Sequence, residues 1–127
     1  MTPKSSAKRQ TGQGKAERYM KPSLLFALKE QEERYGYELL ETIQEFGFIQ
    51  GRAAPGMVYR HLRQLEEEGF VRSTWQTEES GPAKRVYTIT EEGEDALAAW
   101  VAFMEQQSTN IQRFVERYLS LNKKKTR

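Results

Sequence analysis

The chain has 127 residues, of which 37% are hydrophobic and 30% are charged, and its formal net charge is +2. This length suits one domain with a modest core, which we expect a partner subunit to complete. The sequence has no cysteine, one histidine and no Gly-rich phosphate loop, so it lacks the groups for disulfides, thiolate metal sites or a nucleophile–base pair. We expect no enzyme activity, no metal and no cofactor. Without a membrane-length apolar run or an apolar signal region, we expect a cytoplasmic protein and no membrane partner.

Charge is concentrated at the two ends. Residues 1–21 hold six Lys or Arg against one acidic residue, and residues 122–127 hold four Lys or Arg and no acid. The segment between them has ten basic and seventeen acidic residues. Basic tails on an acidic body suit non-specific attraction to phosphates, although such tails can also act simply to keep a protein in solution.

The first part of the chain predicts a tail and two helices. Residues 1–17 are rich in Lys, Ser, Gly and Gln, so we expect a disordered basic tail. Residues 21–31 predict a helix with Leu on one side, because Pro22 is tolerated in a first turn. Residues 35–43 predict a second helix with apolar residues at core spacing.

A third helix is predicted after Ala54, because Pro55 at its entrance fixes φ without losing a hydrogen bond. Its buried stripe is Val58, Leu62 and Leu65, and Gly69 suits a left-handed cap at its end. The opposite side presents Tyr59, Arg60, Arg63 and Gln64. Arg and Gln are the side chains that address guanine and adenine edges in a major groove, but a solvated helix face has a similar composition.

The next segment predicts a β-hairpin. Residues 71–77 and 85–89 are rich in β-branched and aromatic side chains. The tip places Lys84 and Arg85 beside a Gly-Pro turn, where both could hold phosphate oxygens. The alternative is an ordinary turn kept soluble by charge.

A helix followed by a hairpin is the order found in the DNA-contacting half of a winged helix-turn-helix. In that fold the helix enters the major groove and the hairpin lies on the neighbouring DNA backbone. We expect an α+β fold, with this DNA-binding domain over residues 18–90. Glu78 and Glu79 on the incoming side of the hairpin tip indicate that only the outgoing arm of the hairpin would face DNA.

A fourth, long helix is predicted from a Thr90 cap, with a dimerisation helix over residues 91–121 and a basic tail over residues 122–127. Its first turn carries acidic residues that favour the positive end of the helix dipole. A heptad pattern runs along it, with a and d positions at Leu97, Trp100, Met104, Gln107, Ile111, Phe114, Tyr118 and Leu121. We interpret this run as a dimer interface formed by Leu97, Trp100, Met104, Ile111, Phe114 and Tyr118. The alternative is that the helix packs wholly inside one subunit.

Two smaller features allow more than one interpretation. Trp100, Phe103 and Met104 could line an effector pocket between subunits, but an aromatic and Met cluster is more often simply core. His61, the only histidine, lies on the third helix, and we expect it to contact phosphate or solvent.

Three motifs resemble the PadR-type transcriptional regulators. Residues 59–70, YRHLRQLEEEGF, are similar to the family's Tyr-x-x-Leu-x-x-Leu-Glu-x-x-Gly-hydrophobic signature. Residues 35–39, YGYEL, resemble the opening of the family's second helix, and residues 81–93 resemble its wing and the start of the following helix. The similarity covers roughly residues 20–105.

The resemblance implies a dimeric winged-helix repressor with the dimer made by its C-terminal helix. The short C-terminal part is similar to the subgroup with a single such helix, in which flat aromatic ligands can bind between subunits. Residues 79–85 and Tyr118 are similar to regulators responsive to polyhydroxybutyrate. The resemblance also favours the N-terminal turn of the third helix for base contacts, at Pro55, Gly56, Met57, Tyr59 and Arg60.

The sequence therefore predicts a homodimer that binds double-stranded DNA at a palindromic operator, represses transcription and is released by a small hydrophobic or aromatic effector. The alternative is a winged-helix module that uses the same face on an acidic protein and has no specific DNA binding.

Overall fold

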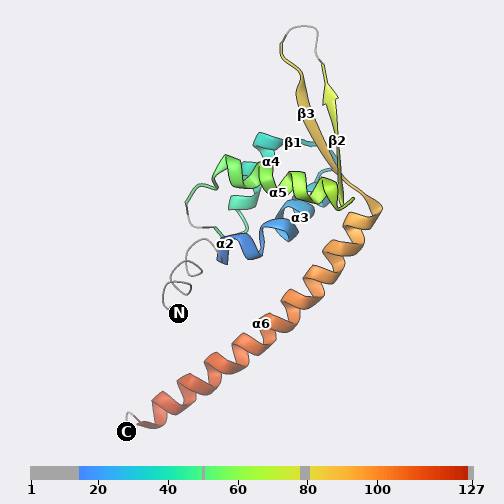
Figure 1. Cartoon of the computed structure of the whole chain (residues 1–127). Coiled ribbons are helices and arrows are strands. Elements are labelled where there is room, and N and C mark those ends of the chain that lie inside the picture. The colour runs from blue at the N-terminus through green and yellow to red at the C-terminus, as the bar shows by residue number, and fades with distance from the viewer. Residues whose placement is uncertain (1–14, 50, 78–80, 126–127) are drawn as a thin grey trace, which may run out of the picture. The chain divides into compact units, whose positions relative to one another are not determined.

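The computed structural model describes residues 15–49, 51–77 and 81–125. Its elements follow the order α2 (Lys15–Arg18), α3 (Met20–Glu30), β1 (Arg34–Tyr35), α4 (Gly36–Gln44), α5 (Pro55–Glu67), β2 (Val71–Gln76), β3 (Lys84–Ile89) and α6 (Glu91–Lys125) (Figure 1). The chain divides into two compact units between Leu97 and Ala98. The first unit has an α+β fold, and α6 supplies the second.

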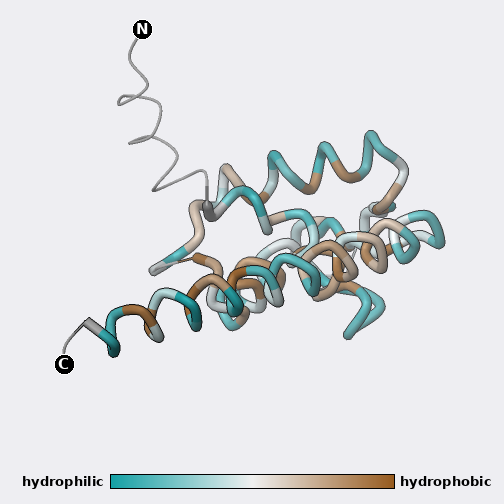
Figure 2. Tube along the Cα trace, turned by 90° about the horizontal axis from the view of Figure 1, so that it is seen from below, coloured by the Kyte–Doolittle hydropathy of each residue, from teal (hydrophilic) through white to brown (hydrophobic). Residues whose placement is uncertain are grey.

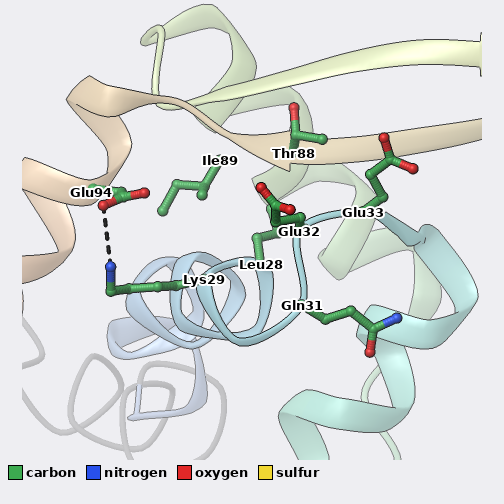
Figure 3. Close-up of a pocket in the computed structure, with 8 residues that line it drawn as sticks. All are labelled: Leu28, Lys29, Gln31, Glu32, Glu33, Thr88, Ile89 and Glu94. Atoms are coloured by element: carbon green, nitrogen blue, oxygen red, sulfur yellow. Dashed lines mark hydrogen bonds and ion pairs between the residues drawn. The ribbon is translucent and has the colours of Figure 1, made fainter.

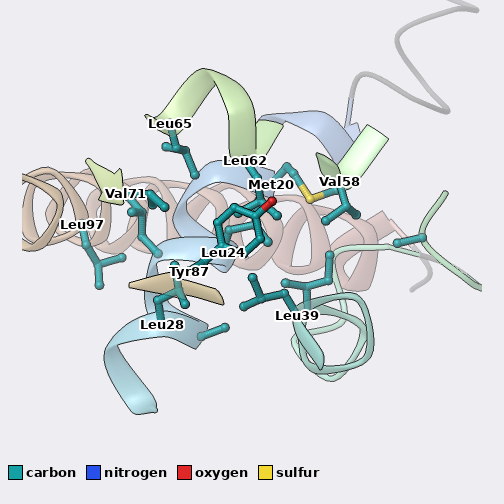
Figure 4. Packing of buried hydrophobic residues seen from close by; sticks show 14 residues of the cluster. Met20, Leu24, Leu28, Leu39, Val58, Leu62, Leu65, Val71, Tyr87 and Leu97 are labelled. Carbon is teal, nitrogen blue, oxygen red and sulfur yellow. The ribbon is translucent and has the colours of Figure 1, made fainter. Parts of the chain in front are cut away.

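The core of the first unit lies among α3, α4 and α5 and one face of the sheet. Its fully buried side chains are Met20, Leu24, Leu25, Leu28, Leu39, Ile43, Val58, Leu62 and Leu65. Figure 4 shows the labelled members of this set converging with Val71 and Tyr87 from the sheet. Burying an aliphatic side chain of this size contributes roughly 1.5–3 kcal/mol. The stripe predicted on the third helix is confirmed, because all three of its members have no exposed surface.

The end of α5 is defined by its capping geometry. Gly69 has φ of +86°, a left-handed conformation that glycine adopts without a Cβ clash. The Phe70 N–H donates to the Leu65 carbonyl at 2.9 Å, and the Gly69 N–H donates to the Glu66 carbonyl at 3.1 Å. This pair of bonds is a Schellman motif, and it turns the chain directly into β2.

The sheet has three antiparallel strands in the order β1-β3-β2. The hairpin register runs from Val71 opposite Ile89 to Gln76 opposite Lys84. The sequence pattern predicted these two strands but missed β1, which pairs Arg34 with Tyr87. A two-residue strand is too short for a period-2 pattern to reveal it.

Thr90 joins the hairpin to α6 as predicted. Its hydroxyl donates to the Gly69 carbonyl at 2.7 Å and accepts the Gly93 N–H at 3.0 Å, which makes it the N-cap of the helix. Gly93 must be small, because a Cβ at that position would overlap the Phe70 carbonyl. The start of α6 is therefore fixed against the end of α5.

The structure corrects one residue of the predicted dimer interface. Leu97 is 4% exposed and belongs to the hydrophobic core of the first unit (Figure 4). The heptad pattern included it because the same face of α6 begins as a core face, and periodicity alone does not separate the two environments. The interface predicted for α6 can begin only after this residue.

The rest of α6 exposes many large apolar side chains. The exposed members are Val101, Phe103, Ile111, Phe114, Val115, Tyr118, Leu119 and Leu121. Figure 2 shows hydrophobic residues recurring between hydrophilic ones along this helix. Among the helices of the described residues, none combines the length and the apolar character that a membrane-spanning segment requires.

Both predicted tails are shorter than expected where the structure describes them. Lys15–Arg18 form the short helix α2, so the disorder predicted to residue 17 does not hold there, and residues 1–14 lie outside the described residues. At the other end, α6 continues to Lys125, past the predicted boundary at residue 121. Lysine is a good helix former and suits the negative end of the helix dipole, so the basic run can extend the helix.

Candidate nucleic-acid interface

The side of α5 opposite its buried stripe carries the residues predicted to read bases. Pro55, Gly56, Tyr59, Arg60 and Arg63 are exposed. Met57 and Gln64 are half-buried, so they present less surface to a ligand. The side chains able to address a base edge on this face are therefore chiefly the two arginines.

Tyr59 has a second role in packing. Its ring lies against Gly36, where a Cβ would stand 2.5 Å from the Tyr59 Cε1 atom. The side chain still keeps 40% of its surface exposed. The start of α4 therefore packs closely on the Tyr59 ring, and Tyr59 joins the two helices at this exposed face.

The environment of His61 differs from the one expected from the sequence. His61 is 6% exposed and its Nδ1 lies 2.9 Å from the Met57 carbonyl, one helical turn earlier. We expected it to contact phosphate or solvent, but its position beside Leu62 on α5 turns it toward the core. The polar character of histidine misled the prediction, and the helical spacing from Val58 and Leu65 was the signal for burial.

Arg85, predicted to grip phosphate at the wing, is held by the protein itself. Its Nε donates to the Ser73 hydroxyl at 2.9 Å, and its Nη2 lies 3.4 Å from the Glu66 Oε1. The guanidinium also stands 5.5 Å from the centre of the Trp75 ring, its cross-strand partner. These contacts tie Arg85 and the hairpin to α5.

Lys84 lies on two tyrosines that the sequence analysis did not place at the wing. Its Nζ is 5.4 Å from the Tyr35 ring centre and 6.0 Å from that of Tyr37. The two rings stack at 5.6 Å, and the Tyr35 hydroxyl donates to the Gln76 side-chain oxygen at 3.2 Å. The pairing of β1 with β3 brings them there, so only that unpredicted strand could have revealed the contact.

The electrostatics of this region also affect Tyr87, which is 6% exposed on β3. Burial raises the pKa of its hydroxyl above the ordinary value, while the positive charge of Arg85 lowers it and nearby Tyr59 and Glu66 raise it. Burial prevails because it disfavours the phenolate form.

A hollow of about 630 Å³ lies elsewhere on the first unit, among α3, the end of β3 and the first turn of α6 (Figure 3). Its lining includes Glu32, Glu33 and the Lys29–Glu94 ion pair at 3.1 Å. This polar lining does not suit a flat aromatic ligand, and none of the predicted effector-pocket residues lines it. Of those residues, Trp100 and Phe103 pack edge to face with ring centres 6.5 Å apart.

The first unit combines the helices α3, α4 and α5, the last with exposed arginines, and a two-stranded hairpin with cations near its tip. This arrangement defines a winged helix-turn-helix protein. A model of the PadR-like family of transcriptional regulators matches residues 24–99. The chain belongs to this family, as the sequence motifs predicted. Its members are regulators rather than enzymes, in agreement with the absence of catalytic groups expected from the sequence.

Two solved structures of PadR-type proteins and one curated regulator are similar to this chain. A PadR-like regulator of Bacillus cereus is 25% identical, with a TM-score of 0.66 over 78% of this chain and 93% of that one. Bacillus subtilis PadR in complex with operator DNA is 27% identical, with a TM-score of 0.58 over 66% of this chain and 47% of that one. The "Probable transcriptional regulator" of Mycobacterium tuberculosis is 35% identical over 68 residues, which are 53% of this chain and 35% of that protein. The chain therefore matches about a third of the length of this curated relative.

Proposed function

We propose that the protein is a sequence-specific DNA-binding repressor that acts in the cytoplasm as a homodimer on a palindromic operator. The observation that carries the proposal is the shared exposure of Arg60 and Arg63 on α5, next to a hairpin that bears Lys84 and Arg85. Arginines on a helix that fits a major groove can read bases, while hairpin cations contact the neighbouring backbone. The relative from Bacillus subtilis, solved with operator DNA, supports the same use of the fold here.

Selection of bound duplexes from a random pool tests sequence-specific binding directly. We expect an enriched palindrome whose half-sites are about one helical turn apart, because a two-fold dimer presents two recognition helices at that spacing. A pool without any enriched motif would reject specific reading. A salt series on duplex binding separates the remaining alternative, a protein-binding winged helix, because phosphate contacts give a steep dependence of affinity on salt.

The homodimer is proposed from the exposed apolar surface of α6. Ile111, Phe114 and Tyr118 are 58%, 75% and 57% exposed, and heptad spacing aligns them on one seam. Removing apolar side chains of this size from water is favourable. A second copy of the same helix offers the matching seam, and sedimentation at micromolar concentration measures the assembly.

A small hydrophobic or aromatic effector is proposed to bind near Trp100, Phe103 and Met104 when the dimer forms. The support is the exposed Phe103 ring packed on Trp100, which a planar ligand could extend by stacking. Flat aromatic compounds should release the operator and quench Trp100 fluorescence. If the Trp100→Phe variant still responds to such compounds with the same affinity, the effector binds elsewhere.

A further inference from the structure

Arg60, central to the proposed reading face, is already bound to a carboxylate of the same chain. Its Nη2 lies 2.7 Å from the Oε2 atom of Glu17, which belongs to α2 and is 43 residues away in sequence. The two side chains are 47% and 39% exposed. Within the residues that the structure describes, Glu17 is the one carboxylate bonded to Arg60.

The pair with Glu17 occupies a guanidinium N–H group of Arg60 that would otherwise donate to DNA. A carboxylate presents oxygens to a guanidinium much as a phosphate does, and both form short charge-assisted hydrogen bonds. The pair is also exposed enough for water and salt to weaken it, so DNA can displace Glu17. After displacement, the negative charge of Glu17 remains beside the DNA phosphates.

We infer that Glu17 competes with DNA for Arg60 and thereby limits affinity for the operator. The inference rests on the proposed function. A loose phosphate contact on unrelated DNA gains little over the existing pair, so Arg60 stays with Glu17. A bidentate contact with the correct base gains more and breaks the pair. Glu17 therefore lowers affinity for the operator by the free energy of the broken pair, and lowers affinity for unrelated sequences by no more than that amount.

A purely structural role is the competing explanation, because the pair also joins α2 to α5. Such a role would change folding stability and would leave the salt dependence of DNA binding unaltered. The two explanations separate in a double-mutant cycle, since competition requires Arg60 to be present.

The experiment measures binding of the selected operator and of a scrambled duplex to four full-length proteins: wild type, Glu17→Gln, Arg60→Ala and the double variant. Glu68→Gln is the matched control, because Glu68 forms a similar exposed pair with Lys21 at 3.1 Å at the opposite end of α5. Thermal unfolding of each variant checks that it is folded.

We expect Glu17→Gln to bind the operator about two- to fivefold more tightly, the range of an exposed ion pair. Its affinity for the scrambled duplex should rise by no more than this, and its salt slope on that duplex should steepen by up to about one unit as Arg60 becomes available to phosphate. Both changes should disappear in the Arg60→Ala background and be absent in Glu68→Gln.

Two results would overturn the inference while leaving the proposed function standing. One is an unchanged affinity and slope in a folded Glu17→Gln variant, with Arg60→Ala still weakening operator binding. The other is an equal gain in the Arg60→Ala background, which would mean that Glu17 acts by general repulsion of DNA. If Arg60→Ala leaves operator binding intact, both the inference and the role of Arg60 in reading are wrong.

Discussion

At the scale of single residues, three cations of the proposed DNA face are held by the protein's own groups. Arg60 is paired with Glu17, Arg85 with Glu66, and Lys84 lies over two tyrosine rings. Exposed pairs of this kind contribute only about 0–1 kcal/mol. They therefore order the side chains without removing them from use by a stronger ligand.

The reading role of Arg60 gives the first prediction at this scale. Arg60→Ala should cost about 1–3 kcal/mol of operator binding if the side chain makes a bidentate base contact. Arg72→Ala is the matched control, because Arg72 is exposed on β2 and points away from α5. Neighbouring side chains of a strand point to opposite faces, and the next one, Ser73, turns toward Glu66 of α5. Anisotropy titrations give the affinities. Unchanged operator affinity for both Arg60→Ala and Arg63→Ala would remove α5 from the interface.

Tyr87 gives a prediction on pH dependence. Burial raises the pKa of its hydroxyl in the folded protein above the unfolded value of 10.0, so the folded state binds the proton more tightly. The stability from this group is complete below that unfolded value and is lost as pH rises through the folded value. Tyr87→Phe should remove this loss.

Urea unfolding of both proteins at about pH 8 and about pH 11 measures the effect, because the other titrating groups are common to both. The free energy of unfolding should fall more steeply for the wild type than for Tyr87→Phe between these values. Equal losses would show that the Tyr87 hydroxyl is not the group responsible.

At the scale of elements, the sequence predicted most of the helices and strands because their signals are local. Pro55 before an apolar stripe and Gly69 after it define α5, and Thr90 caps α6. The placement of Tyr35 and Tyr37 beneath Lys84 depends on β1 pairing with β3, which is a long-range contact without a local pattern. The ion pair between Glu17 and Arg60 was unpredictable for the same reason, since no spacing rule relates residues so far apart.

The hairpin gives the prediction that belongs to this scale. Replacing both Lys84 and Arg85 with Ala should weaken binding to all sequences similarly and reduce the salt slope by about one unit per lost phosphate contact. We expect Lys84→Ala alone to produce most of the change, because Arg85 is bound to Ser73 and Glu66. Titrations at several salt concentrations give the slope. An altered sequence preference with the slope intact would mean that the wing reads bases.

At the scale of the whole molecule, the two units differ in how completely they bury their apolar residues. The first unit has a continuous core that extends from Met20 to Leu97 in sequence. Beyond Leu97, α6 exposes large apolar side chains over its remaining length. An apolar surface of this extent is typical of an interaction site rather than of solvent-exposed helix. The heptad pattern includes Ile111, Phe114 and Tyr118 of this surface, whereas its first residue, Leu97, serves the core.

The dimer is tested by placing a charge in the proposed seam. Ile111 is 58% exposed in the single chain, so Ile111→Lys should leave the first unit folded. In a dimer the same lysine would lose its hydration without a partner, and the neighbouring aromatic side chains would lose burial on the order of a few kcal/mol. We expect a monomer that no longer binds the palindrome tightly, since one half-site offers too few contacts.

Thr109→Lys is the matched control, because Thr109 is exposed two residues earlier at an outer heptad position and its hydroxyl donates to the Glu105 carbonyl. Sedimentation at micromolar concentration should therefore separate the two variants, with Thr109→Lys a dimer and Ile111→Lys a monomer. A folded, dimeric Ile111→Lys protein that still binds the palindrome would mean that the subunits meet on another surface.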